Sequence, residues 1–458
     1  MNYIYQQLVT HDRAQLISML ILKKARLHSW LALMIYRITL DIVFIFSVSP
    51  AFKDHFLFPM VFEANVIYYI YSLLLFFCFC LFIKGDLNNI YDLFNITAII
   101  FYIGPLTAVY GLNSSLTAMP VLATLLAYVL INFTIQTKMS ISAQFKIKSL
   151  SIPQFYIFLW LLIFLFLAWS IISGAIQYVN FDLRSTLYSS RDKLSSLMDI
   201  GIMTYLNIWI TKVIAVILLG LAMQRKKLLH VFIMLGFFAF AFSVTSHRTV
   251  LFLPILVFMI YYVYSSGFTL YQLILMLSGF ILLVFFGIKY FDLDILSAII
   301  FRRALFVSPA ATYVWWDYFT NHDFVVWSDR FLSSVYTSVY NGKNLAYFVG
   351  DEVTNGKYNA VGLNVGLIAS GYANLGWGGI FIYAAILSFV IKLLALVSKS
   401  IVPVWFLAIV FVNPIRTIWT STDIFTGMLT HGVLVGLIIL IITPNKLFSY
   451  KKIILMKG

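Results

Sequence analysis

Long apolar runs separated by short polar stretches cover almost the whole chain. A helix that crosses a membrane needs about 20 mostly apolar residues, and twelve runs meet that length. They lie near residues 30–49, 62–83, 93–110, 117–137, 154–174, 203–223, 229–245, 249–265, 269–289, 366–392, 401–419 and 424–443. The pattern therefore predicts an all-α, polytopic membrane protein with about twelve transmembrane helices.

A long polar interval at residues 291–365 interrupts this series. Its ionisable side chains are crowded among Tyr, Trp and Phe, and they include Arg302, Arg303, Asp317, His322, Asp323, Asp329, Arg330, Asp351 and Glu352. Residues 298–319 contain no glycine and a single proline, which predicts a partly helical cap over the membrane domain. Because charges are scarce elsewhere, we expect the chemistry of the protein in or under this loop.

Composition supports the membrane assignment. Hydrophobic residues make up 62% of the chain and charged residues only 10%, whereas the exterior of a soluble protein must be largely polar. Cys78 and Cys80 both lie in an apolar run, where we expect neither a disulfide nor a metal site. The sequence has no Walker motif, dinucleotide fingerprint or cluster of metal ligands, so we expect neither a cofactor nor a metal.

The positions of the basic residues predict the orientation. If the N-terminus is cytoplasmic, the inner loops and tail carry Lys84, Lys138, Lys146, Lys148, Arg225, Lys226, Lys227, Lys392, Lys399, Lys446, Lys451, Lys452 and Lys457. The short outer loops carry little beyond Lys53, Arg248 and Arg416. This asymmetry places both termini in the cytoplasm. It also accounts for most of the net charge of +14, so the lipid bilayer, and not nucleic acid, is the expected partner.

With this orientation, we expect one membrane domain over residues 1–458 with two long outer loops, at 175–202 and 291–365. Residues 3–28 mix Leu and Ile with Arg and Lys, and we predict there a helix that lies on the inner membrane surface.

Several arginines on the outer side are candidates for binding an anion. Arg248 lies in a tight Ser-His-Arg-Thr hairpin, where its guanidinium could hold a phosphate in a bidentate contact; the alternative is an arginine that snorkels at a helix end. His247 is either a substrate contact or a polar residue at the membrane boundary. Arg302 and Arg303 are either an anion site or part of a surface salt-bridge network. Arg184 and Arg191, seven residues apart, either share a helix face or lie in a solvated loop.

Asp317 is the first candidate for a catalytic base. Tyr313 and Asp317 are four positions apart and share one face of a helix. With Trp316 and Tyr318 beside it, this carboxylate could take the proton of a sugar hydroxyl. The next candidates for the base are Asp323, His322 and Asp329, in that order. Arg416, Asp423 and His431 could line the same outer cavity. Within the membrane, Arg37 and Asp41 have the spacing of a buried structural ion pair.

Residues 359–379, here called the glycine-rich run, carry a resemblance to a known family. The run, NAVGLNVGLIASGYANLGWGG, resembles the signature that enters a late span of Wzy-type polymerases of oligosaccharide repeat units. Residues 301–319, Leu-Arg-Ser at 183–185 with Tyr188, and the Ser-His-Arg-Thr hairpin are similar to the same family. The spacing before Pro309 leaves the choice between Arg302 and Arg303 open.

The resemblance implies an inverting, metal-independent glycosyltransferase of the bacterial plasma (inner) membrane, with its active site on the periplasmic face. It would transfer a growing glycan from undecaprenyl pyrophosphate to a new lipid-linked repeat unit, which builds a surface polysaccharide such as O-antigen, enterobacterial common antigen or capsule. The expected ligand is an undecaprenyl-pyrophosphate-linked oligosaccharide, and a chain-length regulator is a further candidate partner. We expect the arginines, with Asn359, Asn364 and Tyr372 of the glycine-rich run, to contact the substrate.

Two other functions fit a similar architecture. An O-antigen ligase would use lipid A core as its acceptor, and residue chemistry leaves ligase and polymerase both open. A flippase for lipid-linked oligosaccharides should have charges at the membrane centre and short outer loops. The nearly charge-free spans and the long outer loop favour an enzyme.

Overall fold

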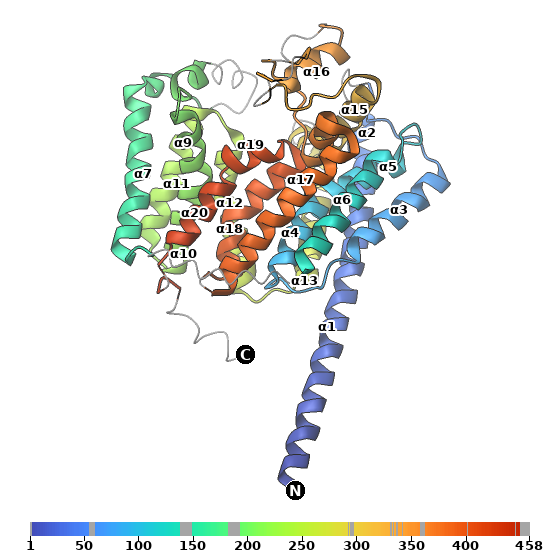
Figure 1. Cartoon of the computed structure of the whole chain (residues 1–458), viewed down its shortest axis with the longest axis vertical. Helices are drawn as coiled ribbons and strands as arrows, with labels where there is room; N and C mark the ends of the chain where they lie inside the picture. Colours follow the sequence, from blue (N-terminus) through green and yellow to red (C-terminus); the bar gives the residue numbers. More distant parts are fainter. Residues whose placement is uncertain are drawn as a thin grey trace. The chain divides into compact units, whose positions relative to one another are not determined.

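The computed structural model describes residues 2–54, 60–137, 149–181, 193–291, 293, 297–329, 332, 334–335, 338–340, 342–357, 362–400, 402–444 and 446–448, with the backbone alone at 2–22, 298–299 and 398–400. These ranges are helices and connecting segments (Figure 1), and their only β-type pairing is an isolated bridge between Glu63 and Asn113. The chain groups into two compact units. Unit 1 comprises Met1–Thr137, Phe268–Phe389 and Ile418–Asp423, and unit 2 comprises Lys138–Gly267, Val390–Thr417 and Ile424–Gly458.

Unit 1 is built around helix α1, which packs along α13. Its elements are α1 (Asn2–Val43), η1 (Phe44–Val48), α2 (Ser49–Phe52), α3 (Val66–Cys80), α4 (Ile90–Ala98), η2 (Ile99–Ile103), α5 (Gly104–Leu112), α6 (Met119–Gln136), α13 (Leu270–Phe291), η5 (Ser297–Phe306), α15 (Val307–Asn321), α16 (Leu345–Val353) and most of α17 (Leu367–Ser400). In unit 2, α10 packs against α11 and α12. Its elements are α7 (Ile152–Ile172), η3 (Ala175–Tyr178), α9 (Met203–Trp209), η4 (Ile210–Ile214), α10 (Ala215–Gln224), α11 (Leu228–Thr245), α12 (Arg248–Ser265), most of α18 (Val404–Thr420), α19 (Ile424–Leu429) and α20 (Val433–Ile442).

The prediction of an all-α, polytopic membrane protein is confirmed. In the described part of the chain, 10 helices or helical stretches are long and apolar enough to cross a membrane. The shorter apolar helices α3 and α18 coincide with the two remaining predicted runs. The protein is therefore an all-α, multi-pass membrane protein.

The N-terminal segment differs from the prediction in one respect. Residues 3–28 are helical, but they are the first part of α1, which continues without a break into the first span. A helix in line with a span cannot lie flat on the membrane surface, so the prediction of a separate surface helix was wrong. The sequence has no glycine or proline between the two parts, and therefore no residue that favours a break there.

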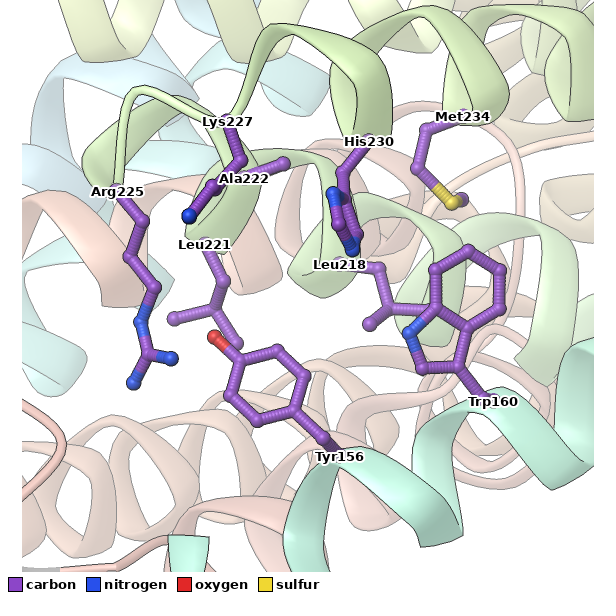
Figure 2. Close-up of a pocket in the computed structure, with 9 residues that line it drawn as sticks. All are labelled: Tyr156, Trp160, Leu218, Leu221, Ala222, Arg225, Lys227, His230 and Met234. Carbon is purple, nitrogen blue, oxygen red and sulfur yellow. The ribbon is translucent and has the colours of Figure 1, made fainter. Parts of the chain in front are cut away.

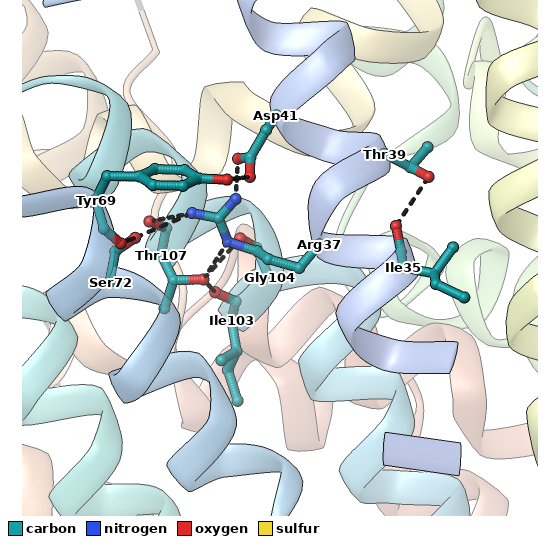
Figure 3. Close-up of polar contacts among 9 residues, drawn as sticks. All are labelled: Ile35, Arg37, Thr39, Asp41, Tyr69, Ser72, Ile103, Gly104 and Thr107. Carbon is teal, nitrogen blue, oxygen red and sulfur yellow. Dashed lines mark hydrogen bonds and ion pairs between the residues drawn. The ribbon is translucent and has the colours of Figure 1, made fainter. Parts of the chain in front are cut away.

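The predicted ion pair of the first span is confirmed, and it is part of a buried polar network (Figure 3). Arg37 is completely buried and pairs with Asp41. A second guanidinium nitrogen donates to the Thr107 carbonyl oxygen at 3.0 Å and to Ser72 Oγ at 3.2 Å. The Tyr69 hydroxyl donates to the other Asp41 oxygen at 3.0 Å. Because both charges have several partners, the network joins α1 to α3 and α5 and has a structural role.

The orientation of the chain can be tested by cysteine labelling. In a background with Cys78 and Cys80 replaced by Ala, we expect Asp351→Cys to react with a membrane-impermeant maleimide in intact cells. Leu228→Cys should react only after the inner membrane is permeabilised. Both positions are exposed in the structure. Whether each cysteine is labelled therefore depends only on the side of the membrane that it faces. Labelling of Asp351→Cys from the cytoplasm alone would reverse the predicted topology.

Candidate functional site

Residues 298–319, from which the sequence predicted a partly helical cap, lie in two consecutive helical elements, η5 and α15. The prediction of helical structure here is confirmed, and η5 is a wide, π-type helix. Such turns are rare and often occur at functional sites. The Thr312 hydroxyl and the Tyr102 hydroxyl, 3.1 Å apart, join α15 to η2, and Ser308 donates to the Thr420 carbonyl. These buried bonds fix which face of α15 points away from the core.

That face of α15 forms one wall of a cavity of about 650 Å³ in unit 1. The other walls come from the end of the first span, the segment after it, and the segment between α5 and α6. The lining residues are Phe44, Met60, Val61, Glu63, Val109, Asn113, Ser115, Leu116, Thr117, Met119, Ala310, Tyr313, Val314, Trp316, Asp317 and Thr320. The predicted shared face of Tyr313 and Asp317 is thereby confirmed. The polar walls come from three segments that the sequence assigns to the same, outer side of the membrane.

Tyr313 is a buried side chain of this wall, with 8% of its surface exposed. Its hydroxyl is buried and makes no hydrogen bond to the described residues. Burial raises the pKa of this phenol well above its ordinary value, with Tyr102 and Tyr110 contributing in the same direction. The hydroxyl therefore stays protonated, and a buried donor without a partner is costly. A polar ligand in the cavity would supply the missing acceptor.

Two carboxylates line the cavity. Asp317 lies at its exposed rim, where it can meet a hydroxyl group that enters from solvent. Glu63 was missed by the sequence analysis, and its backbone is fixed by hydrogen bonds to the Leu112 carbonyl (2.9 Å) and from the Ser114 amide (3.2 Å). Residues 113–117 form a polar stretch directly after an apolar span, and this stretch was the feature of the sequence that could have indicated a polar wall here. Hydrophobic periodicity does not show that this stretch meets α15.

Aromatic side chains lie behind Asp317. Trp316 stacks on Tyr372 of α17 with ring centroids 3.8 Å apart, and Trp377 meets Trp316 edge-on at 5.7 Å. The Thr320 and Tyr372 hydroxyls lie 3.2 Å apart. Tyr372 of the glycine-rich run is thus brought to the site, although it stands behind Trp316 and is not among the lining residues. Aromatic faces of this kind suit the apolar faces of sugar rings.

The glycine-rich run makes a sharp turn within α17. Leu375 and Gly376 have non-helical backbone angles, and Gly376 has a φ of +55°. A Cβ at Gly379 would lie 2.0 Å from the Gly371 carbonyl oxygen, whereas residues eight apart in a continuous helix are separated by about 12 Å. The chain therefore folds back at this point. A Cβ at Gly366 would likewise lie 1.9 Å from the Trp419 carbonyl oxygen, so these glycines permit close backbone contacts.

Asn374 of the same run holds the segment that follows α15, and the sequence analysis did not single it out. Its side-chain oxygen accepts from the Trp327 amide at 2.9 Å, and its carbonyl accepts from the Val326 amide at 3.1 Å. Val326 and Trp327 have φ values of 50° and 52°, a left-handed conformation that is costly for a β-branched residue. The bonds to Asn374 stabilise this unusual connection between the cap and α17.

The other predicted residues of the cap lie outside the cavity wall. The guanidinium of Arg302 lies 4.8 Å from the Phe52 ring centroid; burial, and secondarily the charge of Arg303, lowers its pKa. Arg303 and Asn364 are exposed. His322 stacks on Tyr318 at 4.0 Å, and its Nδ1 lies 2.8 Å from the Tyr318 carbonyl oxygen. Predicted residues outside the described part of the chain are Arg184, Arg191, Arg330 and Asn359.

Arg248 and His247 belong to unit 2 and form the hairpin between α11 and α12. Ser246 ends α11 with a φ of 53°, and Arg248 is the first residue of α12. Both Arg248 and His247 are half-buried. The predicted tight hairpin is confirmed. Arg416 also belongs to unit 2 and donates to Asn413 Oδ1 at 3.2 Å.

No family model, curated protein or solved structure matches the chain. The cavity and the sequence patterns are therefore the features that indicate a function. Among the described residues, no group of His, Cys, Asp or Glu has an arrangement that could hold a metal ion.

Proposed function

We propose that the chain is a membrane glycosyltransferase that joins undecaprenyl-pyrophosphate-linked repeat units into a surface polysaccharide. The observation that carries the proposal is the cavity of unit 1. It combines an accessible carboxylate, Asp317, with the buried hydroxyl of Tyr313, beside the stacked rings of Trp316 and Tyr372. A carboxylate beside aromatic faces suits a reaction in which a sugar hydroxyl is deprotonated.

The reaction needs one base and one site for the leaving group. A hydroxyl oxygen of the incoming repeat unit attacks the anomeric carbon of the growing glycan, and the bond from that carbon to the pyrophosphate oxygen breaks. Asp317 takes the hydroxyl proton, and undecaprenyl pyrophosphate leaves with the bond electrons. Attack from the face opposite the leaving group inverts the anomeric configuration. The Tyr313 hydroxyl donates a hydrogen bond that orients the sugar in the cavity.

Positive charge would stabilise the leaving pyrophosphate as its charge develops. Arg302 and Arg303 lie on η5, which leads directly into α15, and their guanidinium groups suit bidentate contacts with phosphate. Arg302 is half-buried, and burial lowers its pKa. A bound anionic group would stabilise the charged form of its guanidinium. These features support a catalyst more than a flippase, because the described ion pair within the spans, Arg37–Asp41, is enclosed in a structural network.

Deletion of the gene, followed by electrophoresis of the surface glycan, tests the proposal. Loss of a polymerase should leave single repeat units on the lipid acceptor. The wild-type gene should restore the ladder of glycans that differ in length by one repeat unit. Loss of all repeat units from the acceptor would indicate a ligase or a flippase and would contradict the proposal.

Arg248, the arginine of the hairpin in unit 2 that the sequence predicts to hold a phosphate, gives a test that does not depend on the cavity of unit 1. Arg248→Lys keeps the charge but removes the planar guanidinium, so we expect a sharp fall in polymer at normal protein level. Loss of a charged hydrogen bond costs about 1.5–3 kcal/mol, which corresponds to a fall of roughly ten- to a hundredfold. The ladder is measured in a deletion strain that carries the variant. Wild-type ladders from both Arg248→Lys and Arg248→Ala would show that Arg248 only snorkels at the helix end.

A further inference from the structure

A second cavity, of about 270 Å³, lies within unit 2 between α7, α10 and α11 (Figure 2). It is lined by Tyr156, Trp160, Leu218, Leu221, Ala222, Arg225, Lys227, His230 and Met234. Apolar side chains of α10 form its floor, and basic and aromatic side chains form its rim. It shares no residue with the cavity of unit 1, and the proposed polymerase reaction does not use it.

Three basic side chains surround this cavity. Arg225 and Lys227 come from the tight turn between α10 and α11, and His230 comes from the first turn of α11. Figure 2 shows the Arg225 guanidinium, the Lys227 ammonium group and the Tyr156 hydroxyl turned toward the same space. Among the described residues, none of the three basic side chains has an ion-pair partner. The cavity thus gathers positive charge without a matching carboxylate in that part of the chain.

The turn between α10 and α11 places Lys227 at the cavity and its neighbour Lys226 outside it. The Arg225 amide donates to the Leu221 carbonyl at 3.1 Å, and the Lys227 amide donates to the Ala222 carbonyl at 3.0 Å. Lys226, between them, has a φ of 53° and does not line the cavity. The backbone therefore directs Arg225 and Lys227 to the cavity and leaves Lys226 outside it.

Hydrogen-bond donors in the cavity lack an acceptor. The Tyr156 hydroxyl is buried and has no hydrogen-bond partner among the described residues. The Arg225 guanidinium carbon lies 4.7 Å from the centroid of the Tyr156 ring, which holds the cation beside this hydroxyl. Helix α11 begins here without a side-chain cap, so its first amide groups also favour negative charge. An oxyanion in the cavity would give the Tyr156 hydroxyl an acceptor and would lie beside the Arg225 cation.

Exposed apolar side chains lie beside the cavity on α7. On α7, Ile157 and Leu161, next in sequence to the cavity residues Tyr156 and Trp160, each expose 60% of their surface. Trp160 lies between these side chains and the basic rim, and its ring meets His230 edge-on at 6.3 Å. Tryptophan at such a boundary is typical of the level of lipid headgroups. A ligand that fits both parts has an anionic head and apolar chains.

We propose that this cavity binds the phosphate headgroup of an anionic phospholipid, with the acyl chains lying along α7. Arg225 and Lys227 contact the phosphate oxygens, and the Tyr156 hydroxyl donates to one of them. The positive-inside pattern assigns the Arg225–Lys227 turn to the cytoplasmic side, so the bound lipid belongs to the inner leaflet. Basic residues beside a span commonly attract anionic lipids in this way.

Lipid-dependent thermal stability of the purified, full-length protein tests this proposal. We expect phosphatidylglycerol, added to neutral detergent micelles, to raise the midpoint of thermal unfolding more than phosphatidylcholine or inorganic phosphate does. Arg225→Gln and Lys227→Gln should each raise the half-saturating concentration of phosphatidylglycerol by about tenfold, since a charged hydrogen bond contributes roughly one power of ten in affinity.

Lys226→Gln is the matched control, because it removes the same charge from the adjacent position outside the cavity. It should leave the half-saturating concentration within about twofold of the wild-type value. Equal weakening by Lys226→Gln and Lys227→Gln would show a diffuse surface attraction and would overturn the proposal. An equal shift from inorganic phosphate or from phosphatidylcholine would also overturn it, because the site would then not require an anionic lipid. Tyr156→Phe keeps the ring under Arg225, and an unchanged concentration for this variant would contradict the role of the hydroxyl.

Discussion

Asp317→Asn should give a folded protein that binds the lipid-linked substrate and makes almost no polymer. Asparagine is nearly isosteric with aspartate and still accepts a hydrogen bond, but its amide does not take up the hydroxyl proton. Loss of a general base typically slows a reaction by about 10²–10⁴-fold. The rate of chain extension by purified protein measures the effect, and thermal unfolding checks the fold.

Two carboxylate variants serve as controls for Asp317→Asn. Glu63→Gln changes the other carboxylate of the cavity, and Asp323→Asn changes a carboxylate near the end of α15 that does not line the cavity. We expect Asp323→Asn to retain near-normal turnover. Near-normal turnover by Asp317→Asn would exclude Asp317 as the base, and Glu63 would become the first candidate, because it lines the same cavity.

Arg37→Met should destabilise the protein by about 3–5 kcal/mol, since removal of one partner of a buried ion pair leaves an uncompensated charge. Arg37 is completely buried and bonds to residues of α3 and α5. The variant leaves Asp41 with the Tyr69 hydroxyl as its remaining partner. A large fall in the midpoint of thermal unfolding in detergent would show the effect.

The double variant Arg37→Met/Asp41→Leu separates a charge effect from a packing effect. Replacement of both partners by apolar residues of similar size is often neutral or stabilising, so the double variant should recover most of the stability lost by Arg37→Met. A double variant as unstable as the sum of the single variants would contradict the account of this network as a buried ion pair.

Apolar length and residue spacing were enough to predict most of the fold. Each predicted span coincides with a helix because a membrane requires long apolar runs with internally satisfied backbone groups. The four-residue spacing of Tyr313 and Asp317 predicted their common face, which lines the cavity. The continuous helix α1 was not predicted. The mixture of basic and apolar residues at 3–28 indicates a helix, but it does not show whether that helix is separate from the first span or continues into it.

Contacts between distant segments were beyond the sequence pattern. Glu63 and Asn113 join the wall opposite Asp317, but spacing within one segment carries no information about which loops meet. The sharp turn at Leu375 and Gly376 was also hidden, since glycine is common in membrane helices. The close approach of Gly371 and Gly379, which the structure reveals, shows why glycine is needed in this run.

Chain extension by the purified protein tests the central claim most directly. The protein is incubated with one substrate, an undecaprenyl-pyrophosphate-linked repeat unit, and without any lipid A core. We predict a ladder of glycans that differ by one repeat unit, with one undecaprenyl pyrophosphate released for each new linkage, and no ladder from Asp317→Asn. A folded wild-type protein that binds this substrate but leaves every glycan at a single repeat unit would contradict the account.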